Sequence, residues 1–143
     1  MTVQNTSILW PMLAHIGWIT LLYAWLTVAR QRAVKSGAIE YSGFVLGREE
    51  PLEVARITRN LANQFEWPMV FYALTVLLVA LGKVTLVDVI AAWVFVLGRV
   101  AHTLVQTLTD NVPLRGQVFT INFLAVLVLA AHAVLLAWEG VGR

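Results

Sequence analysis

The sequence predicts an all-α fold, an integral membrane four-helix bundle formed by one domain over residues 1–143. Of its residues, 59% are hydrophobic and only 13% are charged, against about 25% charged in soluble domains. The mean hydropathy is +0.77. Several segments nearly free of charge approach the length of about 20 residues that a helix needs to cross a bilayer.

The first predicted helix covers residues 8–29, a run without acidic or basic charge. Trp10 lies near its start, and Tyr23 and Trp25 lie near its end, where aromatic side chains favour membrane interfaces. His15 lies inside the run. We expect it to be a neutral side chain that bonds a neighbouring helix rather than a catalytic group.

The second predicted helix covers residues 52–81 and follows a glycine-containing loop. Pro68 lies inside it and predicts a kink. Arg59, Asn63 and Glu66 are spaced at i, i+4 and i+7, so a continuous helix would place them in one stripe. Such polar groups at the edge of an apolar span are expected to face protein or water rather than lipid.

The third predicted helix covers residues 86–109 and carries a second polar stripe. Arg99, His102, Gln106 and Thr109 fall at i, i+3, i+7 and i+10, which is one helical face. This stripe lies in the half of the helix nearest its C-terminus.

The fourth predicted helix, residues 115–138, follows a turn and completes the topology. Basic residues predict the orientation, because they favour the cytoplasmic side. One side holds most of them: Arg30, Arg32, Lys35, Arg48, Arg56, Arg59 and Arg115. The other side holds only Lys83 and Arg143. Both termini are therefore predicted on the non-cytoplasmic side, and the two polar stripes are predicted to meet at the cytoplasmic end.

Cations outnumber carboxylates in this predicted cluster, which favours an anionic ligand with carboxylate groups. Arginine also lowers the pKa of a nearby thiol by stabilising its thiolate. Because the chain has no cysteine, such a thiol would belong to a bound cofactor, and Cys-ligated metals are excluded. No metal site is predicted, and no nucleic-acid partner, since no basic patch alternates with aromatic residues.

A purely structural interpretation of each residue also stays open. Glu66 would then pair with Arg99 or Arg59, His102 would bond a helix backbone, and Asn63 would link two helices. Several ionisable groups converge at one place in the membrane, which favours a functional site for the cluster as a whole.

The pattern resembles the MAPEG family, the membrane-associated proteins in eicosanoid and glutathione metabolism. Two segments carry the resemblance: Arg59-x3-Asn63-x2-Glu66 followed by Pro68, and Arg99-x2-His102 followed by Pro113 and Arg115. The resemblance implies a homotrimer of four-helix bundles with glutathione bound between protomers. It implies these site residues: Arg59, Asn63 and Glu66 on the charged and amide groups, His102 and Gln106 lining the site, Arg115 stabilising the thiolate, and Arg30 or Arg32 assisting.

The implied function is that of a glutathione transferase or peroxidase-like protein in a bacterial inner membrane, its site facing the cytoplasm. The thiolate would attack a lipophilic electrophile or hydroperoxide that arrives from the lipid bilayer. Gln106 and Trp67 stand where relatives place tyrosines, so specialised eicosanoid synthesis is not expected. The alternative is a non-catalytic membrane protein of the same fold that binds a lipid or an anionic ligand. A transporter that uses Glu66 ranks last, because no inverted repeat is visible.

Overall fold

The computed structural model describes residues 3–45 and 50–141, and every regular element in those two ranges is helical. The elements are α1 (Leu9–Lys35), the short 3₁₀ helix η1 (Tyr41–Phe44), α2 (Leu52–Ala62), α3 (Pro68–Ala80), α4 (Leu86–Leu108) and α5 (Val112–Val141). By length and composition α1, α4 and α5 can each cross a membrane, and α3 is a shorter apolar helix. The predicted fold class, an all-α membrane protein, is confirmed.

The first helix is longer than predicted, because α1 continues past residue 29 to Lys35. Its basic last turn complements the negative end of the helix dipole. The helix ends at Lys35, and the chain then turns away at Gly37, whose φ of +74° is the left-handed conformation that glycine tolerates. The N–H groups of Gly37 and Ala38 then donate to the carbonyls of Val34 and Ala33, respectively. Two residues used in the orientation argument, Arg48 and Arg143, lie outside the described residues.

The predicted second helix is wrong as a single element, because residues 63–67 separate α2 from α3. Pro68 has no N–H and fits the first position of α3. At the end of α2, a terminal amino group of the Arg99 guanidinium donates to the carbonyl of Asn63 at 3.0 Å. A distant helix therefore satisfies a carbonyl that the break leaves without a helical partner.

The helices α4 and α5 form an antiparallel hairpin. The start of α4 is fixed by a capping box between Thr85 and Asp88. Asp88 is buried and also accepts from Nδ1 of His132 on α5, at 2.9 Å. Farther along the pair, Gly98 faces the buried amide of Asn122, and a Cβ at position 98 would collide with its Oδ1. The small residue therefore permits the close approach of the two helices.

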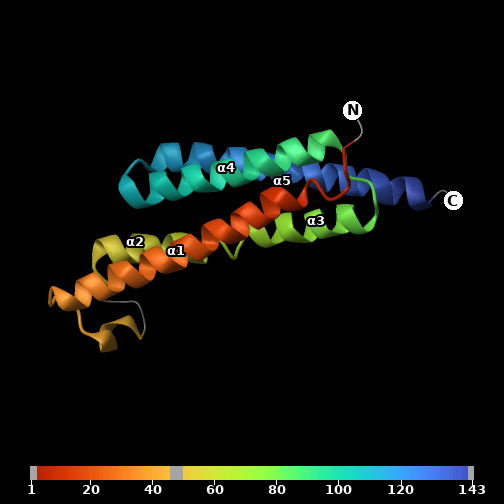
Figure 1. Ribbon diagram of the computed structural model, residues 1–143. Coiled ribbons are helices and arrows are strands. Elements are labelled where there is room, and N and C mark those ends of the chain that lie inside the picture. The colour runs from red at the N-terminus through yellow and green to blue at the C-terminus, as the bar shows by residue number, and fades with distance from the viewer. Residues whose placement is uncertain (1–2, 46–49, 142–143) are drawn as a thin grey trace.

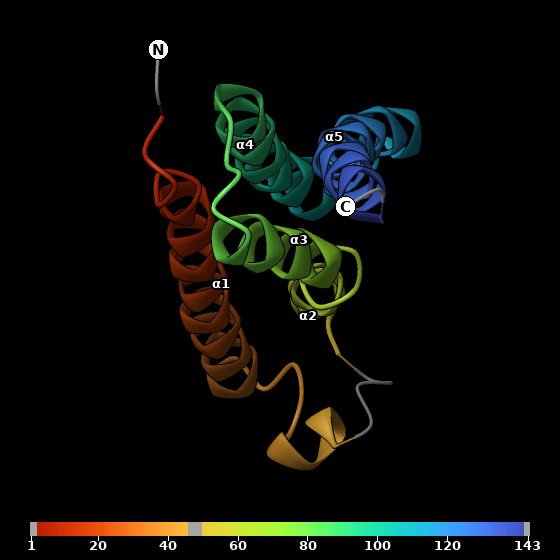
Figure 2. The same ribbon diagram turned by 90° about the vertical axis from the view of Figure 1, so that its right-hand side faces the viewer.

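The arrangement places one end of the bundle around α2 and the connection between α4 and α5, and both termini at the other end (Figure 1). Figure 2 shows α3 between α1 and α5. One buried cluster contains Phe71, Phe95 and Leu129, from α3, α4 and α5, and a second contains Leu22 and Ile57, from α1 and α2. The polar residues of α2 and α4 meet at the end away from the termini.

Candidate functional site

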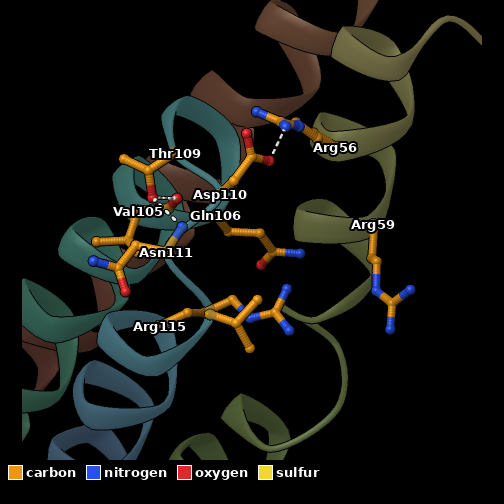
Figure 3. A pocket seen from close by; sticks show the side chains of 9 residues that line it. Arg56, Arg59, Val105, Gln106, Thr109, Asp110, Asn111 and Arg115 are labelled. Atoms are coloured by element: carbon orange, nitrogen blue, oxygen red, sulfur yellow. Dashed lines mark hydrogen bonds and ion pairs between the residues drawn. The ribbon is translucent and has the colours of Figure 1, made fainter.

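Two adjoining cavities lie between α2, α4 and the start of α5, and Arg59 and Arg115 line both. The first has a volume of about 210 Å³, and its other lining residues are Asn63, His102, Gly116 and Phe119. The second has a volume of about 140 Å³ and is lined by further residues of all three helices, including Gln106 (Figure 3). The two cavities together are the candidate site.

The candidate site is electropositive. No acidic side chain of the described residues lines the larger cavity, whereas Arg59 and Arg115 both do. In the smaller cavity, a guanidinium nitrogen of Arg56 donates to the carboxylate of Asp110, so these two charges offset one another (Figure 3). The guanidinium groups of Arg59 and Arg115 remain available for an anion.

Gln106 ties α4 to α2 at the wall of the site. Its Oε1 accepts from Nδ2 of Asn60 at 3.0 Å and from Nδ2 of Asn63 at 3.2 Å. Asn63 therefore links two helices, as the structural interpretation expected, and also lines the larger cavity. One side chain serves both roles because its amide lies at the boundary between the core and the site.

A buried chain of side chains continues from Gln106 into the core. Arg99 is only 1% exposed, and its Nε donates to Oε1 of Gln64 at 3.1 Å. Since arginine can only donate, this contact assigns the orientation of the Gln64 amide. Nε2 of Gln64 then donates to Oδ1 of Asn60 at 3.2 Å. At the other end, His15 lies between Oε1 of Gln64 and the hydroxyl of Tyr72, which confirms that it bonds neighbouring helices.

His102 is a buried polar residue of the site whose Nδ1 has no partner among the described residues. Its side chain is 4% exposed, and its Nδ1 makes no hydrogen bond to any described residue. The ring centroid lies 6.4 Å from that of Phe119, which also lines the larger cavity. The expectation that His102 only bonds a helix backbone is not met at Nδ1. An unpaired buried nitrogen beside a cavity needs a partner, which a bound ligand or a water molecule can provide.

The structure brings five predicted site residues to these cavities: Arg59, Asn63, His102, Gln106 and Arg115. Glu66 does not line either cavity. It lies in the break after α2, exposed, close enough to Arg99 for a Coulomb attraction but without an ion pair among the described residues. The single stripe predicted for Arg59, Asn63 and Glu66 is therefore wrong.

Arg30 and Arg32 lie at the end of α1 and line neither cavity. A terminal nitrogen of Arg30 donates to Oε1 of Glu50 at 2.5 Å, and its guanidinium lies 5.1 Å from the centroid of the Phe44 ring. These contacts secure the segment around η1. The assignment of Arg30 and Arg32 to the glutathione site stays a prediction.

Sequence reasoning missed the residues that hold the site in place. Asn60 and Gln64 lie one helical turn apart and are both fully buried, and Thr103 donates to Oδ1 of Asn60 at 3.0 Å. The available signal was their spacing, because Asn60 and Gln64 are at i and i+4.

Comparison with known proteins agrees with this architecture. The model of the MAPEG family matches residues 8–135, most of the chain. No curated protein and no solved structure matches the chain. The multi-pass helical fold and the family match together establish that the chain is a membrane protein and belongs to the MAPEG family, whose members act in glutathione and eicosanoid metabolism.

Proposed function

We propose that this protein is a membrane-bound glutathione transferase or peroxidase-like enzyme, in which the thiolate of glutathione attacks a lipophilic electrophile or hydroperoxide. The observation that carries the proposal is the larger cavity, which Arg59 and Arg115 both line and which has no acidic residue among its described lining residues. Two guanidinium groups and no carboxylate favour a ligand with net negative charge.

The residues present fit glutathione, which has two carboxylates, an ammonium group, two amides and a thiol. Arg59 provides a forked donor for a carboxylate. Asn63 provides an amide, and the unpaired Nδ1 of His102 provides a buried polar contact. Bound glutathione would supply the nucleophilic thiol that a chain without cysteine lacks. Glu66 does not line the cavities of its own protomer. It would contact the ammonium group only if glutathione extends beyond those cavities.

Arg115 is the residue to which we assign thiolate stabilisation. It lies in the first turns of α5, beside N–H groups that carry the positive end of the helix dipole. Its half-buried guanidinium lines both cavities. A fixed cation in partly desolvated surroundings favours the charged form of a neighbouring thiol, which lowers its pKa.

We further propose a homotrimer, with a neighbouring copy closing the site. Arg59 and Glu66 are exposed near the break after α2, where a membrane-embedded chain leaves charges toward protein or water rather than lipid. The basic residues at this end support an orientation toward the cytoplasm. The membrane that we propose is a bacterial inner membrane. Native mass spectrometry in mild detergent tests the stoichiometry, and a monomer that binds glutathione at full affinity would contradict the closing role.

The test of the proposed function is conjugation of glutathione to a panel of apolar electrophiles, and reduction of a lipid hydroperoxide, by the purified protein. We expect turnover that falls at least about tenfold in Arg115→Ala, since one charge-assisted contact contributes roughly 1.5–3 kcal/mol. Lys83→Ala removes an exposed cation remote from the site and should leave turnover unchanged. Binding without turnover of any substrate would support the non-catalytic alternative instead.

A further inference from the structure

A third cavity, of about 410 Å³, lies between α1 and the beginning of α3 and shares no lining residue with the candidate site. Ile16 and Phe65 form part of its apolar wall, and both are about half exposed on the surface of the chain. The hydroxyl-bearing side chains of Thr20, Tyr23 and Tyr72 also line it. Because α1 has the length and composition of a membrane-spanning helix, we expect this cavity to be open to molecules dissolved in lipid.

The hydroxyl of Tyr72 is held in one direction by the buried chain behind it. It lies 2.6 Å from Nδ1 of His15, whose Nε2 lies 3.2 Å from Oε1 of Gln64. That oxygen also accepts from Nε of Arg99, so it can only be an acceptor toward His15. Nε2 of His15 therefore carries a proton and donates.

The other nitrogen of His15 has no proton. His15 is fully buried, has no carboxylate partner among the described residues, and shares its Gln64 contact with the Arg99 guanidinium. A second cation there would be costly, so the imidazole is neutral. Nδ1 is then an acceptor, and Tyr72 donates its hydroxyl proton to it. To a ligand that reaches it, the Tyr72 oxygen therefore offers only lone pairs.

The hydroxyl proton of Thr20 is also in use, because this hydroxyl donates to the carbonyl of Ile16 at 3.0 Å. Two of the three hydroxyl groups at the cavity are thus acceptors with no proton to offer. Only Tyr23, which is 51% exposed, is not held by a described partner and can donate. With two hydroxyl acceptors and one possible donor lining the cavity, a ligand that donates a proton is favoured over one that only accepts.

We propose that this cavity binds a membrane-soluble molecule that ends in a hydroxyl group, an aliphatic alcohol or a phenol, which donates its proton to the Tyr72 oxygen. The chain of the ligand lies against Ile16 and Phe65, and the hydroxyl satisfies an acceptor that lipid tails cannot. Carbonyl compounds and ethers lack the proton and bind more weakly. The proposal does not depend on glutathione chemistry.

The experiment measures equilibrium binding of tritiated 1-tetradecanol and of its methyl ether to the full-length protein in lipid nanodiscs, with empty nanodiscs subtracted. We expect saturable binding of the alcohol, about three- to tenfold tighter than that of the ether, because one hydrogen bond contributes roughly 0.5–1.5 kcal/mol. This comparison uses the wild-type chain and therefore needs no substitution. Equal binding of the two probes, or no saturable binding because a neighbouring copy fills the cavity, would overturn the proposal.

Three variants locate the contact. In Tyr72→Phe the preference for the alcohol should disappear, because the acceptor is removed while the aromatic wall remains. In Ile16→Trp both probes should lose binding, because the indole fills the cavity. Tyr23→Phe is the matched control, the same phenol-to-phenyl change at another wall position. A preference that survives in Tyr72→Phe, or that disappears in Tyr23→Phe, would show that the assigned direction of the hydrogen bond is wrong.

Discussion

Gln106 offers the sharpest separation of a structural role from a binding role at the candidate site. Replacement by leucine keeps a similar volume but removes the oxygen that accepts from Asn60 and Asn63. Hydrogen bonds between membrane helices contribute about 0.6 kcal/mol on average and up to about 1.7 kcal/mol each. Losing two of them, one from a fully buried amide, should lower the free energy of unfolding by about 1–3 kcal/mol.

The assay is reversible unfolding in mixed micelles with increasing dodecyl sulfate, followed by tryptophan fluorescence. Gln106→Glu is the matched control, because its carboxylate retains the acceptor oxygens. We expect it to keep most of the stability and yet to weaken glutathione binding, since it adds an anion to a cavity lined by Arg59 and Arg115. Wild-type stability in Gln106→Leu would refute the assignment of Gln106 as the link between α2 and α4.

Three other substitutions test the fold that supports the site. Gly98→Ala should lower the free energy of unfolding by about 1–3 kcal/mol through overpacking against Asn122. Adding Asn122→Ala to this variant should restore stability in the same unfolding assay. An unchanged stability in Gly98→Ala would contradict the close approach of α4 and α5. Thr85→Ala should lower the free energy of unfolding by about 1 kcal/mol, because it removes the helix cap shared with Asp88. Wild-type stability, with unchanged helix content by circular dichroism, would argue against the cap. Arg56→Ala should change stability by less than about 1 kcal/mol, because the carboxylate it pairs with is largely exposed, and a larger loss on chemical unfolding would show that this ion pair is structurally important.

The convergence of two polar faces could be predicted from the sequence because it depends on local periodicity and topology. Arg99, His102 and Gln106 share one face of α4, and short connections place that face beside α2. Four of the sequence-derived residues line one cavity as a result: Arg59, Asn63, His102 and Arg115.

The break between α2 and α3 could not be placed from the sequence. Pro68 predicts a kink, but the break begins five residues earlier, at Asn63. The carbonyl of Asn63 accepts a hydrogen bond from Arg99, which lies 36 positions away in the chain. The ion pair between Arg30 and Glu50 could not be predicted either, because it joins residues that are 20 positions apart in the chain. In an apolar chain, hydrophobic residues face both lipid and core, so periodicity does not distinguish the buried face.

The most direct test of the central account is the ultraviolet absorbance of the glutathione thiolate on the purified protein at neutral pH, with binding measured in parallel by calorimetry. We predict a thiolate signal when glutathione binds to the wild-type protein, and binding with little or no thiolate signal in Arg115→Ala. No binding of glutathione to the wild-type protein would contradict the proposed function. A thiolate signal that persists undiminished in Arg115→Ala would contradict the role assigned to that arginine.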